Sequence, residues 1–67
     1  MNKLIDIGKA IKVRRKLLGL TQDELAEISG ISVRSLKAVE LGKGNPGISQ
    51  LNRVLDALGM KITIGIK

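Results

Sequence analysis

The chain is 67 residues long, carries a formal net charge of +6, and contains no Cys, His, Phe, Tyr or Trp. Because cysteine and histidine are absent, we expect no disulfide, no metal site, no cofactor and no enzymatic activity. The length sets a single domain, 1–67, which buries only about 60% of the surface that its unfolded form exposes. The positive charge favours a polyanionic partner: DNA, RNA or an anionic membrane.

Three further absences narrow the choice of partner and of cellular compartment. No apolar run approaches the roughly 20 residues of a membrane span. Charges interrupt the N-terminal segment MNKLIDIGKAIKV, so it lacks the continuous apolar region of a signal peptide. We expect a cytoplasmic protein that does not bind membranes. The lack of aromatic residues argues against single-strand binding, because single-strand binders stack bases on aromatic rings.

The first predicted helix runs from about Asn2 to Leu18 and is ended by Gly19. Its apolar residues recur at spacings of three, four and seven, which places them in one stripe: Leu4, Ile7, Ile11 and Leu18. Arg15 lies near that stripe, so it needs a negatively charged partner if it is buried. The alternative is that its side chain reaches outward to water.

The second predicted helix starts after Thr21 and ends at Gly30. Thr21 and Glu24 have the Thr-x-x-Glu spacing of a capping box. Gly30 can take a left-handed backbone conformation without steric cost, which suits the end of a helix. Three residues are predicted to form the apolar side of this helix: Leu25, Ala26 and Ile28.

The third predicted helix is capped by Ser32 and runs from Val33 to about Leu41. Leu36 and Val39 share one face of it, which we expect to point into the core. The other face is expected to be exposed and basic, and consists of Val33, Arg34, Lys37 and Ala38.

A glycine-rich loop, 42–47, separates this helix from a fourth. The fourth predicted helix starts at Ile48 or Ser49 and ends at Leu58, with Gly59 as its C-terminal stop. Its predicted core face consists of Ile48, Leu51, Leu55 and Leu58, with Val54 alongside.

The C-terminal tail changes period from helix to strand. Apolar residues alternate there with polar residues or glycine, which predicts a strand at 60–66: Met60, Ile62, Ile64 and Ile66. The chain offers no second strand, so we expect the same strand of a second copy to pair with it about a two-fold axis. The alternatives are a frayed tail or an extension laid on the core.

Two short helices joined by a glycine turn, the second with an exposed basic face, are the plan of a helix-turn-helix reader of DNA. The spacing of Gln22, Ala26 and Gly30 resembles the Xre-like repressor family, and so does the ending VELGK at 39–43. The segments LLGLTQ at 17–22 and LNRVLDALGM at 51–60 resemble flanking parts of that family. The alternative is a helical hairpin with no nucleic-acid role.

The resemblance implies a mainly α fold: a four-helix bundle of the repressor type, with its helix-turn-helix core at 21–41 and a short C-terminal β-strand paired across a dimer. In Xre-like proteins an arginine of the first helix pairs with the glutamate that closes the recognition helix. The matching residues here are Arg15 and Glu40. Some relatives carry amide side chains at the base-reading positions, and this chain does not, so the operator sequence cannot be deduced.

The predicted DNA-binding residues divide into two groups. Gln22, Ser32, Ser35 and Lys43 lie at helix starts or at the end of the motif, where they can hold phosphates. Their alternative role is that of ordinary caps or solvated side chains. Base contacts fall to the exposed side of the third helix. Val33 could meet a thymine methyl group, Lys37 could reach a base or a phosphate, and Ala38 allows close approach. Arg34 is the best candidate, because its planar fork matches the O6 and N7 atoms of guanine.

We therefore predict a homodimeric, sequence-specific repressor that binds a two-fold operator in double-stranded DNA. The short chain and its alternating tail resemble HipB-type antitoxins, which implies a kinase-like toxin as a further partner. The alternative is a protein–protein adaptor that uses the helical bundle as a scaffold. The two differ in salt dependence, because a DNA reader loses affinity steeply as salt rises.

Overall fold

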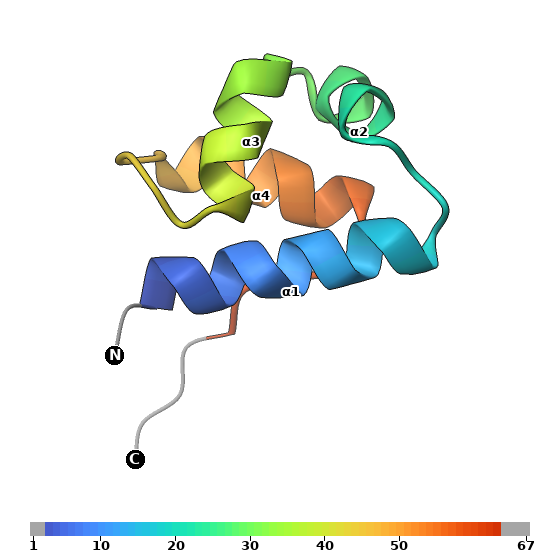
Figure 1. Cartoon of the computed structure of the whole chain (residues 1–67). Coiled ribbons are helices and arrows are strands. Elements are labelled where there is room, and N and C mark those ends of the chain that lie inside the picture. Colours follow the sequence, from blue (N-terminus) through green and yellow to red (C-terminus); the bar gives the residue numbers. More distant parts are fainter. Residues whose placement is uncertain (1–2, 64–67) are drawn as a thin grey trace.

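The computed structural model describes residues 3–63, which fold into a small helical bundle (Figure 1). In Figure 1, α1 runs along the base, α3 stands over it, α4 lies behind α3, and α2 is seen end-on at the top. The helix bounds are α1 Lys3–Leu17, α2 Gln22–Ser29, α3 Val33–Glu40 and α4 Ile48–Ala57. None of the helices in this part of the chain is long and apolar enough to cross a bilayer.

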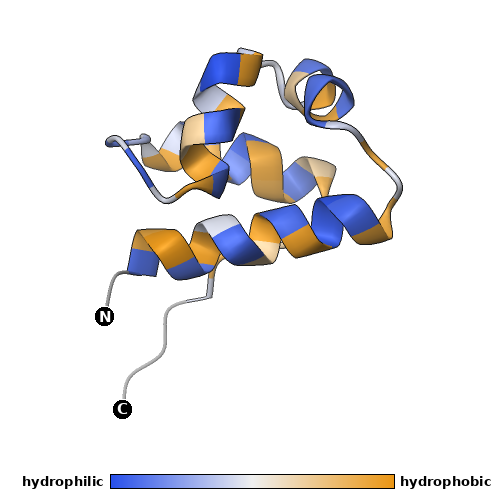
Figure 2. Cartoon of the chain, viewed as in Figure 1, coloured by the Kyte–Doolittle hydropathy of each residue, from blue (hydrophilic) through white to orange (hydrophobic). Residues whose placement is uncertain are grey.

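The core of the bundle is aliphatic, as expected from a chain without aromatic residues. Hydrophobic and hydrophilic residues alternate along every helix (Figure 2), so each helix can turn an apolar side inward. The side chains buried at the centre are Ile11, Leu25, Ala26, Leu36, Val39, Leu51, Val54, Leu55 and Leu58. Contacts between α1 and α3, α2 and α3, and α2 and α4 hold the bundle together.

The predicted ends of α2 are confirmed by their capping geometry. The Thr21 hydroxyl accepts a hydrogen bond from the Glu24 amide at 3.0 Å, and the Glu24 carboxylate accepts one from the Thr21 amide at 2.9 Å. This reciprocal pair is the capping box. Gly30 has a φ of 71° and donates its amide proton back into α2, which ends that helix as the sequence predicts.

Helices α1 and α3 approach each other closely at Gly8, which is buried. A Cβ atom added to Gly8 would lie 2.7 Å from the carbonyl oxygen of Glu40 and nearer still to that of Val39. Because these are backbone atoms, no side-chain rotation can make room. The absence of a side chain at Gly8 therefore sets the spacing between α1 and the last turn of α3.

Three predicted core residues are instead exposed: Leu18 (44%), Ile28 (60%) and Ile48 (67%). Helix α1 ends at Leu17, so Leu18 belongs to the turn that follows it. The buried side of α2 contains Ser29, and Ile28 points about 100° away from it. Ile48 is the first residue of α4, where the side chains of neighbouring helices no longer cover it.

The predicted C-terminal strand is not found among the described residues, because 60–63 follow α4 without regular secondary structure. An edge strand needs a partner strand, and within 3–63 the chain provides none. Met60 packs against the core, and its amide donates to the Leu55 carbonyl oxygen at 2.8 Å. Ile64 and Ile66, the outer half of the predicted strand, lie outside the described residues.

Candidate nucleic-acid interface

Helix α3 carries an exposed basic face, as the sequence predicts. The side chains of Arg34 and Lys37 are exposed, and that of Ala38 is half-buried beside them. Leu36 and Val39 fix the opposite face in the core. Arg34 and Lys37 therefore belong to a helix whose position the core determines.

Val33 is predicted to be exposed, but the structure buries part of it. Its side chain is half-buried and packs against the core cluster. Val33 lies three residues before Leu36 and seven before Glu40, so all three residues share the inward side of α3. The surface that Val33 can offer to a thymine methyl group is correspondingly smaller than the sequence suggests.

The two predicted phosphate-binding serines are joined in the cap of α3. The Ser32 hydroxyl accepts a hydrogen bond from the Ser35 amide at 3.0 Å and donates one to the Ser35 hydroxyl at 2.9 Å. The capping role of Ser32 is thus confirmed. Ser32 is exposed and Ser35 half-buried, so a phosphate contact by either remains a prediction.

A buried ion pair between Arg15 and Glu40 connects α1 to the end of α3. Arg15 Nε donates to Glu40 Oε2 at 2.7 Å and Nη2 donates to Oε1 at 3.1 Å, a bidentate geometry. The two residues are only 8% and 7% exposed. The hydrogen bond to Glu40 raises the pKa of the Arg15 guanidinium above its ordinary value, so this charge is permanent.

A hydrogen bond from Gln22 connects a third helix, α2, to this ion pair. The Gln22 Nε2 atom donates to Glu40 Oε1 at 3.1 Å, while Arg15 Nη1 donates to the Leu20 carbonyl oxygen at 2.9 Å. The pair thus joins α1, the turn before α2, the start of α2, and α3. The sequence predicts Gln22 as a phosphate contact and gives no indication of its link to Glu40. This hydrogen bond fixes where its amide group lies.

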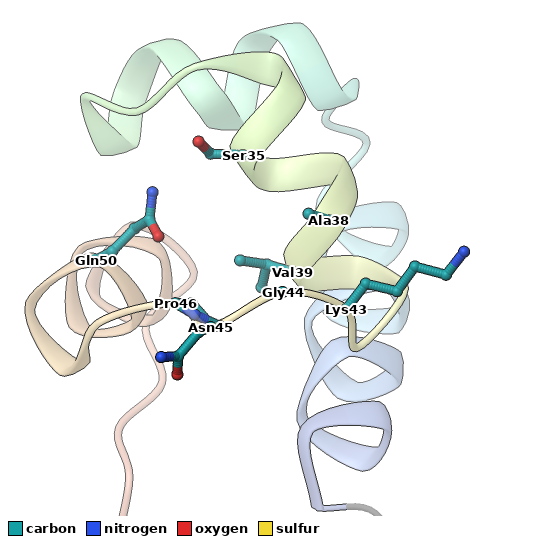
Figure 3. A pocket seen from close by; sticks show the side chains of 8 residues that line it. All are labelled: Ser35, Ala38, Val39, Lys43, Gly44, Asn45, Pro46 and Gln50. Atoms are coloured by element: carbon teal, nitrogen blue, oxygen red, sulfur yellow. The ribbon is translucent and has the colours of Figure 1, made fainter.

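Two surface hollows flank α3. The first, which we call the α3–α4 hollow, has a volume of about 170 Å³ and no acidic residue in its lining. Figure 3 shows the Gln50 amide pointing toward Ser35 across this hollow, while the Lys43 side chain extends away from it. Its lining residues are Ser35, Ala38, Val39, Lys43, Gly44, Asn45, Pro46 and Gln50.

The second hollow, which we call the α1–α3 hollow, has a volume of about 220 Å³ and lies beside the buried ion pair. Its lining residues are Lys12, Gln22, Lys37, Glu40 and Leu41. Lys12 is contributed by α1, a helix to which the sequence assigned no part in DNA binding. Only its place in the fold brings it next to Lys37.

A larger groove of about 350 Å³, the α1–tail groove, lies between α1 and the segment after α4. Its lining is mostly apolar and includes no residue of α3. The lining residues are Lys3, Asp6, Ile7, Ala10, Leu55, Met60, Lys61, Ile62 and Thr63. Two predicted dimerisation residues, Met60 and Ile62, border it. Met60 and Ile62 therefore lie on a different surface from the predicted DNA contacts of α3.

Helices α2 and α3 are short and are joined by a turn at Gly30. The inner face of α3 is fixed in the core, and its outer face is exposed and basic. This arrangement defines a helix-turn-helix protein. Comparison with known proteins agrees. The sequence model of the helix-turn-helix family matches residues 11–64, and the chain belongs to this family, in its Xre-like branch.

Its relatives are transcriptional regulators and not enzymes. An uncharacterized HTH-type transcriptional regulator of Sinorhizobium fredii, y4mF, is 39% identical over 59 residues, covering 88% of this chain and 78% of that protein. An uncharacterized regulator of the same type from Methanothermobacter thermautotrophicus is 43% identical over 49 residues, covering 73% and 71%. The immunity repressor protein of Bacillus phage phi105 is 39% identical over 57 residues, which span 85% of this chain but 40% of that repressor.

The fold also matches a solved structure of the family. The restriction-modification controller protein C.AhdI from Aeromonas hydrophila has a TM-score of 0.83 to this chain at 26% sequence identity, with 91% of this chain and 92% of that one covered. The prediction of a mainly α bundle of the repressor type is confirmed by this match.

Proposed function

We propose that this protein binds double-stranded DNA in a sequence-specific way and acts as a dimeric transcriptional repressor. The observation that carries the proposal is the exposed basic face of α3. The core and the Arg15–Glu40 pair fix the buried side of the same helix, so the basic face is held outward. A helix of this kind fits the major groove of B-DNA, which is about 12 Å wide.

In this proposal the exposed side of α3 reads bases, and Arg34 is its principal reader because its guanidinium matches guanine bidentately. Ala38 lies beside it, and Lys37 on the same side can reach a base or a phosphate. Phosphate contacts come from residues around that face: Gln22, Ser32, Ser35 and Lys43. The net charge of +6 supports electrostatic association with the DNA backbone.

Dimerisation is proposed to occur through the tail, 60–66, whose described residues 60–63 line the α1–tail groove. Met60 and Ile62 border that groove together with Ile7 and Leu55, so a second copy could extend an apolar surface that already exists. A dimer would hold two α3 helices at a fixed separation, which suits half-sites about one helical turn apart.

The experiment has two stages, because the operator is unknown. Selection from a random duplex library first identifies the cognate sequence, and fluorescence anisotropy then measures affinity for cognate and random duplexes over a range of salt concentrations. We expect tighter binding to the selected duplex and a steep loss of affinity with salt. Absence of binding to any duplex would leave the adaptor reading, in which the bundle is only a scaffold for another protein.

Within this class we further propose the antitoxin subtype, in which the protein also binds a kinase-like toxin. The support is the sequence resemblance to HipB-type antitoxins in a short chain with an alternating tail. Co-expression of this chain with the product of a neighbouring kinase-like gene, followed by size-exclusion chromatography, tests the idea. Separate elution of the two proteins would reject the antitoxin subtype and leave the repressor intact.

A further inference from the structure

We propose that the α1–α3 hollow binds a backbone phosphate of DNA and that Lys12, on α1, is a DNA contact of this protein. The ligand is a phosphodiester group, held by Lys12 of α1 and Lys37 of α3 in the hollow that Gln22 also lines. This proposal rests on the proposed DNA-binding function. It extends the interface beyond the helix-turn-helix to the first helix of the chain.

The first argument is the balance of charge in the hollow. Its one acidic lining residue, Glu40, is buried, and its carboxylate is already paired bidentately with Arg15. Lys12 and Lys37 are exposed, and among residues 3–63 neither of them belongs to an ion pair. Two uncompensated ammonium groups therefore line a single concave surface, which is an arrangement that attracts an anion.

The second argument is the position of the hollow relative to α3. Lys37 and Glu40 line the α1–α3 hollow, whereas Ser35 and Ala38 line the α3–α4 hollow. Lys37 and Ser35 are two residues apart, which is about 200° around a helix, so the two hollows lie on opposite flanks of α3. The major groove is bordered by two phosphate backbones. A helix about 10–12 Å in diameter that enters the groove therefore turns one flank toward each strand.

The third argument is that the hollow is held in shape by buried contacts. The Arg15–Glu40 pair joins α1 to α3, and Lys12 lies one turn before Arg15 on the same helix. The hydrogen bond from Gln22 to Glu40 fixes the start of α2 at the same place. The base of Lys12 thus has a determined position beside α3, and its flexible stem can carry the ammonium group to a phosphate.

The test compares Lys12→Gln with the wild-type protein on the selected operator and on a random duplex, over a series of salt concentrations. A phosphate contact carries no sequence information, so affinity should fall by the same factor on both duplexes. The slope of log affinity against log salt should become shallower by about 0.9 for each bound copy, which corresponds to one lost phosphate contact. Lys12→Arg keeps the charge and should retain the wild-type slope.

Lys9→Gln is the matched control, because Lys9 is an exposed lysine of the same helix that does not line the hollow. It should leave the slope unchanged. An unchanged slope in Lys12→Gln, or an equal decrease in Lys9→Gln, would overturn the assignment of Lys12 while leaving DNA binding by the wild type intact. A wild-type protein that binds no duplex would instead refute the proposed function itself.

Discussion

Arg15 Nε lies 2.7 Å from Glu40 Oε2, and this contact links α1 to Glu40, the last residue of α3. Both side chains are almost completely buried. Burial makes the pair costly to break, because the remaining partner keeps a charge that neither water nor a counter-ion compensates. The contact therefore matters for the position of α3 as well as for stability.

Replacing Glu40 by alanine is expected to lower the free energy of unfolding by about 3–5 kcal/mol, because Arg15 is left buried without its counter-charge. Urea denaturation measures the change. Glu27→Ala, a change at an exposed glutamate of α2, is the control and should stay within about 0.5 kcal/mol of wild type. A double-mutant cycle with Arg15→Ala should give losses well below additive, whereas additive losses would mean that the two residues do not interact.

Substitution of Gly8 by alanine should destabilise the fold although alanine is the better helix former. The new Cβ would fall within 2.7 Å of the Glu40 carbonyl oxygen, so α1 would have to move away from α3. We expect a net loss of about 1–3 kcal/mol in urea denaturation. Gly47→Ala is the control, because a Cβ at Gly47 meets no atom within 4 Å. Equal stability of Gly8→Ala and wild type would show that the two helices are not in close contact there.

Arg34→Ala is expected to weaken binding to the cognate duplex by about 1–3 kcal/mol while largely preserving binding to random duplexes. The reason is that an exposed guanidinium on the outer side of α3 can read guanine, whereas non-specific affinity comes from phosphate contacts. Fluorescence anisotropy on both duplexes measures the difference. Arg53→Ala removes the same charge from an exposed position of α4 and serves as the control. Equal losses on the two duplexes would reassign Arg34 to phosphate binding.

The capping box at the start of α2 should make stability depend on pH through Glu24. The hydrogen bond from the Thr21 amide lowers the pKa of this carboxyl below its ordinary value of 4.5. A depressed pKa stabilises the folded state above the ordinary value, and this contribution is lost as the pH falls through the lower, folded-state value. Denaturation of wild type and Glu24→Gln over this acidic range measures it. The stability difference between them should shrink as the pH falls, and a constant difference would contradict the assignment.

Local rules predicted the helix ends, because a capping box and a glycine in the left-handed conformation are set by residues close in sequence, as Thr21, Glu24 and Gly30 show. The resemblance to Xre-like proteins supplied the Arg15–Glu40 pair, which joins residues 25 positions apart. Neither source indicated Gly8 or Lys12. Their roles depend on how α1 lies against α3, and a periodic pattern gives the buried side of a helix without giving the neighbour that it touches.

The same limit explains the exposed isoleucines. Ile28 and Ile48 are large apolar residues of the kind usually found in a core, and their exposure follows from where α2 and α4 lie in the bundle. The tail is a different case, since its alternation predicts a strand and residues 3–63 provide no partner strand for it. Alternation indicates which residues share a face of a strand, and it does not indicate where a pairing strand would come from.

Removing 61–67 is expected to convert a dimer into a monomer. The truncation begins after Met60, because the amide of Met60 bonds to Leu55 and its side chain packs against the core, so each domain should stay folded. The removed segment carries Ile62, Ile64 and Ile66, and each fully buried isoleucine contributes about 1.5–3 kcal/mol. Sedimentation of full-length and truncated chains at the same concentration measures the change, with circular dichroism to verify the helices. Operator affinity should fall sharply while the reading helix is intact, because two half-sites are no longer bound by one particle.

Ile62→Lys in the full-length chain should act in the same direction, whereas Lys61→Gln should not. If the truncated chain still sediments as a dimer, the interface lies elsewhere, and the exposed apolar residues of the helices become the next surface to test.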